Sequence, residues 1–106
     1  MLFRSAAKSL AELIETTAWI RGADDAAARG AAFDYQRLFA LTTIACLWAQ
    51  IIGSIRDKQG DFYETKRKTA HFYMQQVLPE AGALHEIITG GADSLAAFQP
   101  QEFGKQ

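Results

Sequence analysis

The longest apolar stretch of the chain, residues 38–55, carries two hydrophobic stripes with helical spacing. Successive positions of each stripe are three or four residues apart, which places their side chains along one side of an α-helix. The first stripe is Leu38, Leu41, Ala45, Trp48, Ile52 and Ile55, and the second is Ala40, Ile44, Leu47 and Ile51. We therefore predict a central helix over residues 32–56 that the remaining helices cover.

A transmembrane segment is the alternative for this stretch, because roughly 20 mainly apolar residues can span a bilayer. Polar side chains interrupt the stretch at Thr42, Thr43, Gln50 and Ser54, and Arg37 and Arg56 lie directly at its ends. Its flanks lack the basic cluster and the aromatic belts that are typical of membrane spans. We interpret the stretch as a core helix of a cytoplasmic protein without a membrane span.

A first helix is predicted over residues 5–21 and ends before Gly22. Its expected inward face is formed by Leu10, Leu13, Ile14, Thr17 and Ala18. Asp24 or Asp25 can cap a short helical turn, which we expect Gly30 to interrupt before the central helix begins.

The third long helix is predicted over residues 61–89, with Asp61 as N-cap and Glu64 as its reciprocal capping partner. Pro79 should kink this helix, and Gly90 with Gly91 should end it before a short helix near residues 95–98. The expected inward stripe is Ala70, Met74, Val77, Ala81, Leu84 and Ile88. The fold class is all-α, an antiparallel up-down bundle of three long helices plus a short C-terminal helix.

Length and charge are those of a single small domain. The chain has 106 residues and a net charge of −1, which gives no electrostatic reason to bind nucleic acid. The segment Leu2-Phe3-Arg4-Ser5 matches the peptide that the end of a common sequencing adapter encodes in one reading frame. We expect residues 1–5 to be a non-native leader and residues 6–106 to be the domain.

No arrangement of residues predicts a catalytic, cofactor-binding or metal site. His71 and His85 would lie roughly 20 Å apart on one helix, too far to share a metal. The single cysteine, Cys46, is expected to be buried packing. Residues 66–68 are basic but have no glycine-rich loop beside them, so a phosphate site is only weakly indicated. The aromatic residues Phe62, Tyr63, Phe72 and Tyr73 are spaced for packing in the core.

The segment from residue 61 to residue 98 resembles the end of the C-terminal extension of acyl-CoA dehydrogenase-like flavoenzymes. The matching features, in order, are Phe62-Tyr63, Lys66, Thr69-Ala70, Phe72-Tyr73, Val77-Leu78-Pro79, Thr89 and Gly91-Ala92-Asp93-Ser94. Upstream, YQRLFAL at residues 35–41 resembles the preceding helix of the same extension. The resemblance covers about residues 10–103.

The resemblance implies a helical fragment of a longer FAD enzyme that desaturates acyl-CoA thioesters with a glutamate base. The flavin and substrate sites of such enzymes precede this extension, so no functional residue is carried over, and FAD is expected only in the parent. The expected function is packing and assembly of the parent. The alternative is a free-standing helical protein-interaction module, and an independent enzyme is a weaker third hypothesis.

Two kinds of partner are expected, the rest of the parent enzyme or its subunits and, for the isolated fragment, a second copy of itself. Three helices cannot surround a helix that is apolar on most sides, so one flank of the central helix should stay open. The candidate self-association face is Ile44, Leu47 and Ile51.

Overall fold

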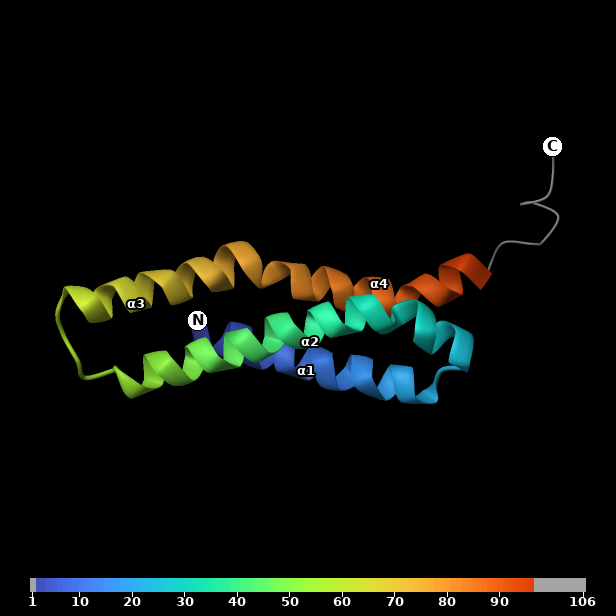
Figure 1. Cartoon of the computed structure of the whole chain (residues 1–106), viewed down its shortest axis with the longest axis horizontal. Coiled ribbons are helices and arrows are strands. Elements are labelled where there is room, and N and C mark those ends of the chain that lie inside the picture. Colours follow the sequence, from blue (N-terminus) through green and yellow to red (C-terminus); the bar gives the residue numbers. More distant parts are fainter. Residues whose placement is uncertain (1, 97–106) are drawn as a thin grey trace, which may run out of the picture.

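The computed structural model describes the backbone of residues 2–96 and the side chains of residues 2–90. The chain forms α1 (Leu2–Gly22), α2 (Asp25–Ser54), α3 (Asp61–Phe72), the π-helix η1 (Tyr73–Val77) and α4 (Pro79–Ala96). Its direction reverses between α1 and α2 and again between α2 and α3 (Figure 1). Residues 2–96 contain no β-strand, so the all-α class is confirmed.

The central helix begins earlier than predicted, at Asp25, and runs without interruption to Ser54. Asp24 is its N-cap, and its carboxylate accepts a hydrogen bond of 2.8 Å from the backbone N–H of Ala27. The predicted break at Gly30 is wrong, since this glycine lies inside α2. A glycine lowers helix propensity by about 1 kcal/mol but removes no backbone donor, so a well-capped helix can continue through it.

The loop between α2 and α3 is held by an arginine and not by the predicted capping pair. Gly60, with φ of +122°, is the N-cap of α3, and no side chain caps the helix. Arg67 instead donates hydrogen bonds to the carbonyl oxygens of Ile55 (2.8 Å) and Lys58 (2.5 Å). It also binds Glu64, with 2.6 Å between Nη1 and Oε1. The expected partner of Asp61 therefore helps to orient the loop-binding arginine.

The predicted disturbance at Pro79 takes the form of a wide π-helical turn directly before it. The backbone N–H of Leu78 donates to the carbonyl of Tyr73 over 2.9 Å, a bond across five residues. Proline has no N–H and crowds the preceding turn, which explains why regular α-geometry is lost here.

The predicted helix end at Gly90 and Gly91 is wrong, because α4 continues through both glycines to Ala96. As at Gly30, the glycines weaken the helix without taking away a donor. The predicted separate short helix is replaced by this continuation, and its last residues, 97 and 98, lie outside the described residues.

The core lies between α2, α4 and the inner side of α1, and α4 contacts both of the other helices. The predicted stripe of α2 supplies Leu38, Leu41 and Ala45 as buried residues, and burial becomes partial toward Ile55. The predicted stripe of the third helix is also confirmed, with Val77 as its one half-buried member. Its buried members are Ala70, Met74, Ala81, Leu84 and Ile88.

The predicted inward face of α1 is correct for Leu13 and in part for Thr17, which is half-buried and contacts Tyr35, and it is wrong for Leu10, Ile14 and Ala18. The buried residues of α1 are Ala6, Ser9, Leu13 and Thr16, whereas Leu10 and Ile14 are 42% and 63% exposed. Small side chains at three of these four positions let the backbone of α1 approach its neighbours closely. Hydrogen bonds satisfy the buried hydroxyl of Thr16, which donates to the carbonyl of Glu12 at 2.8 Å.

Candidate functional site

The most prominent surface feature is a row of exposed apolar side chains along α2. We call it the open face and define it as Phe33, Ala40, Ile44, Leu47 and Ile51. The larger members are exposed to 77% (Phe33), 42% (Ile44), 52% (Leu47) and 39% (Ile51). It includes all three residues of the predicted self-association face. Phe33 was not predicted, although it precedes Ala40 by one heptad and Leu47 by two.

Three polar contacts fix the rotation of α2 and so decide which side stays open. The hydroxyl of Tyr73 donates to the carbonyl of Leu41 over 2.6 Å. The hydroxyls of Tyr35 and Thr17 lie 2.6 Å apart. Because these contacts come from η1 and α1, they hold the Leu38 side of α2 against the other helices and leave the opposite side uncovered.

The third contact is the ion pair between Arg37 of α2 and Glu80 of α4. Arg37 Nη2 donates to Glu80 Oε1 over 2.9 Å, and Arg37 Nε contacts the second carboxylate oxygen. This hydrogen bond lowers the pKa of Glu80 and raises the pKa of Arg37. The charged side chain of Arg37 beside the open face is therefore already paired within the chain.

A shallow hollow of about 410 Å³ lies at the N-terminal half of the open face. It is lined by Phe33, Gln36, Arg37, Ala40, Leu41 and Ile44. Its one charged lining residue, Arg37, is held by Glu80. The hollow therefore presents apolar surface to a partner and contains no convergent polar groups for catalysis.

The prediction that α2 is a core helix with one open flank agrees with the exposure of Ile44, Leu47 and Ile51. By length and composition alone α2 could cross a membrane, with a mean hydropathy of 1.3 over its most apolar window. Core helices of soluble proteins pass the same test, but here only 22% of that window is buried. Several of the other residues are half-buried, and the exposed apolar residues among them form the open face.

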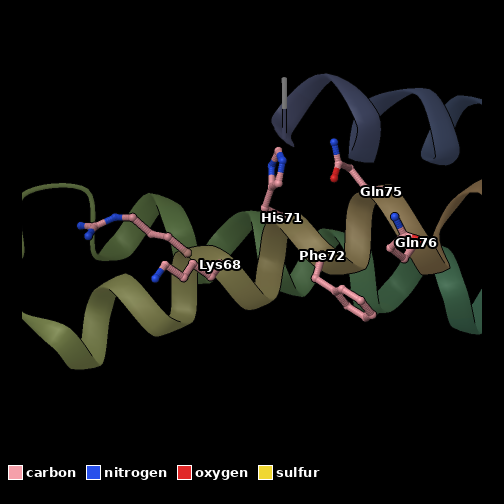
Figure 2. A pocket seen from close by; sticks show the side chains of 6 residues that line it. Lys68, His71, Phe72, Gln75 and Gln76 are labelled. Carbon is pink, nitrogen blue, oxygen red and sulfur yellow. The ribbon is translucent and has the colours of Figure 1, made fainter.

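A second hollow, of about 570 Å³, lies on α3 and η1 and is open to solvent. Arg67, Lys68, His71, Phe72, Gln75 and Gln76 line it. Figure 2 shows that His71 and Gln75 extend toward the start of α1, whereas Phe72 points the opposite way. Arg67 already binds the α2–α3 loop. Of the basic residues 66–68, Arg67 and Lys68 are among the lining residues of this hollow, and Lys66 is not.

The two histidines occupy separate structural positions. His71 is exposed, and His85 is half-buried with Nδ1 2.7 Å from the Thr16 hydroxyl and Nε2 3.8 Å from Glu15. Since the Thr16 hydroxyl proton is directed to Glu12, the threonine oxygen accepts from Nδ1–H. His85 therefore joins α4 to α1. Within the part of the chain that the structure describes, no three His, Cys, Asp or Glu side chains are grouped as metal ligands.

The remaining candidate residues are only partly as predicted. Cys46 is half-buried and not fully buried. Of the four aromatic residues expected in the core, Tyr73 is buried, Tyr63 is half-buried, and Phe62 and Phe72 are 65% and 60% exposed. Phe62 packs edge to face on Tyr63 at 5.2 Å, and the ammonium of Lys66 lies 5.2 Å from its ring centre. Phe62 therefore packs locally on the surface of α3.

Comparison with known proteins gives one match. Neither the curated proteins nor the solved structures contain a match to this chain. A protein-family model, described as acetyl-CoA dehydrogenase C-terminal like, matches residues 2–99. The match confirms the resemblance found over about residues 10–103. The chain belongs to the acetyl-CoA dehydrogenase C-terminal like family.

Proposed function

We propose that this chain is a non-catalytic helical-bundle domain of an acyl-CoA dehydrogenase-like FAD enzyme, and that it serves packing and assembly of the parent. The observation that carries the proposal is the open face of α2. Residues 38–55 contain no charged side chain, yet Ile44, Leu47 and Ile51 are exposed. Exposed apolar surface of this kind is typical of protein contacts and not of sites for polar substrates.

The polar groups of the chain support the same interpretation. Desaturation of an acyl-CoA requires a free carboxylate base beside a flavin. Glu80 and Glu64 are paired with Arg37 and Arg67. Neither hollow brings an unpaired carboxylate together with an enclosed apolar cavity. We therefore propose that FAD and the catalytic glutamate belong to preceding domains of the parent, which is expected to be cytoplasmic.

A free-standing helical interaction module is the second candidate, and the same open face favours it. The two candidates differ in their genetic context. A flavoenzyme reading frame that continues directly into this sequence supports the first, whereas an independent promoter and start site supports the second.

The test is a cofactor and activity assay on the purified chain. We expect no flavin absorbance near 450 nm, and no oxidation of acyl-CoA by an artificial electron acceptor after incubation with added FAD. A complete acyl-CoA dehydrogenase assayed in parallel serves as the positive control. Copurification of FAD in near-stoichiometric amount would contradict the proposed role.

A further inference from the structure

We propose that the open face of α2 binds a second copy of this chain, with the two α2 helices antiparallel about a two-fold axis between Ile44 and Leu47. The proposal rests on the proposed assembly role and names the partner for it. In a two-fold contact the same surface is used by both subunits. The surface must therefore be complementary to itself in shape and in charge.

The absence of charge along the face is the first requirement. Residues 38–55 carry no charged side chain over about 26 Å of helix at 1.5 Å per residue. A charged partner surface would lose the hydration of its charges on covering this length, which is costly. An uncharged partner surface avoids this cost. The open face of another copy meets this condition, and Arg37 at its edge is already paired with Glu80.

The backbone dipoles of two α2 helices favour the antiparallel direction. The start of each helix carries partial positive charge and its end carries partial negative charge. An antiparallel pair brings the start of each helix near the end of the other, whereas a parallel pair brings like ends together. Charged side chains near the two ends are mixed in sign and do not oppose this direction: Arg21, Asp24, Asp25, Arg29, Asp34 and Arg37 at the start, and Arg56, Asp57, Lys58 and Asp61 after the end.

The order of side-chain sizes along the open face fits one register of the antiparallel pair. An axis between Ile44 and Leu47 places Ile44 opposite the partner subunit's Leu47, and Ala40 opposite the partner subunit's Ile51. The centre of the contact is then filled by large side chains, and toward each end a small residue faces a large one. This alternation lets two helices interdigitate.

The packing around α2 argues against a lipid bilayer as the occupant. α1 and α4 lie against α2, and they carry Glu12, Glu15, Glu80 and Glu86. A bilayer that received α2 together with these helices would also receive their carboxylates, which is costly in hydrocarbon. A protein surface can cover the open face alone.

The contact is small compared with a standard interface, which has about 20–30 residues on each side. We therefore expect a reversible dimer with a dissociation constant on the order of 10–100 μM.

Sedimentation equilibrium of the purified chain tests the contact at concentrations from about 5 to about 500 μM. We expect a monomer–dimer equilibrium for the unchanged chain. Leu47→Glu should remain monomeric throughout with unchanged helical circular dichroism. Ile14→Glu is the matched control, because Ile14 is 63% exposed on α1 outside the open face, and this variant should dimerise normally. A monomeric unchanged chain, or equal loss of dimer in both variants, would overturn the proposal.

Disulfide trapping in a Cys46→Ala background tests the direction. A mixture of Ala40→Cys and Ile51→Cys variants should form a mixed disulfide on mild oxidation, whereas Ser54→Cys alone should not form a dimer. A Ser54→Cys dimer without the mixed disulfide would show a parallel pair and contradict the antiparallel arrangement.

Flotation with phosphatidylcholine vesicles tests whether a lipid bilayer covers the open face instead of a second copy of the chain. We expect the chain to stay unbound. Vesicle binding that Leu47→Glu abolishes, together with a monomer in solution, would assign the face to lipid and overturn the proposal. A monomeric chain without FAD leaves the proposed assembly role intact, whereas a chain that binds FAD contradicts that role whatever its oligomeric state.

Discussion

At the scale of single residues, the positions that carry the family resemblance have structural roles. Tyr73 is buried and donates to the carbonyl of Leu41, which joins η1 to α2. Ala70 and Leu78 are buried in the core, and Pro79 follows the π-helical turn. The family pattern in this part of the chain therefore records how the third helix is held against α2.

The hydroxyl of Tyr73 gives a pH-dependent test of this contact. Burial raises the pKa of Tyr73 above its ordinary value of about 10. The folded chain therefore keeps this proton better than the unfolded chain. The contribution to stability is fully present below pH about 10 and is lost as the pH rises through the raised pKa.

We expect Tyr73→Phe to lower the free energy of unfolding by about 1 kcal/mol at pH 7, because one buried hydrogen bond is lost. Above pH about 10, as the pH rises through the raised pKa of Tyr73, the unchanged chain should lose stability more steeply than this variant. Urea denaturation followed by circular dichroism measures both effects. Tyr63→Phe, which removes a tyrosine without this hydrogen bond, should keep the alkaline dependence, and a parallel pH profile for Tyr73→Phe would contradict the assignment.

At the scale of the elements, helical periodicity correctly predicted the buried helix faces on which large apolar residues dominate. It identified the buried side of α2 and the stripe from Ala70 to Ile88. It failed for α1, where Ala6, Ser9 and Thr16 are buried while Leu10 and Ile14 are exposed. Close helix packing favours small side chains, and a hydrogen bond compensates for the burial of a hydroxyl group. Neither effect can be read from a hydrophobicity pattern.

Glycines caused the errors at helix boundaries, because their effect depends on backbone conformation. Gly30 lies within α2, whereas Gly60 has a positive φ of +122° before α3. The sequence pattern predicted an interruption at Gly30, which the structure does not show. Only at Gly60 does the backbone adopt a conformation that other residues rarely reach.

This difference gives paired substitutions with opposite signs. An added Cβ at Gly30 meets no atom within 4 Å, so Gly30→Ala should raise the free energy of unfolding by about 0.5–1 kcal/mol through helix propensity. Gly60→Ala should lower it by about 1 kcal/mol or more because its φ is strained. Thermal and urea unfolding measure both variants. Destabilisation by Gly30→Ala would contradict a continuous α2.

At the scale of the whole molecule, the arrangement of three helices leaves α2 covered on one side. The open flank could be predicted, since three helices do not surround a helix with two apolar stripes, and Ile44, Leu47 and Ile51 are indeed exposed. The extension of this face to Phe33 could not, because the expected break at Gly30 placed the start of the helix beside it. The molecule that covers the open face could not be predicted from hydrophobic periodicity, because this pattern describes one chain and not its partner.

Energetic estimates for the open face indicate a weak dimer. Fully burying a Leu, Ile or Phe side chain contributes about 1.5–3 kcal/mol. In the proposed register the partner subunit covers Ile44, Leu47 and Ile51, which together expose an area equivalent to a little more than one such side chain. Phe33 lies beyond the end of the partner subunit's α2 and is not counted. Two subunits would then gain about 4–8 kcal/mol, which is of the same order as association costs of about 4–15 kcal/mol, so any dimer is weak.

If the dimer forms, the stability of the fold should depend on protein concentration. Above the dissociation constant, a tenfold rise in concentration stabilises the dimer by about 1.4 kcal/mol, or about 0.7 kcal/mol per subunit. For a domain of this size the melting temperature should rise by about 3–6 °C per tenfold step. Differential scanning calorimetry at increasing concentrations measures the shift. Leu47→Glu should melt at a temperature independent of concentration, whereas Ile14→Glu should follow the unchanged chain. A concentration-independent melting temperature in all three proteins would mean that α2 keeps its open face uncovered in solution.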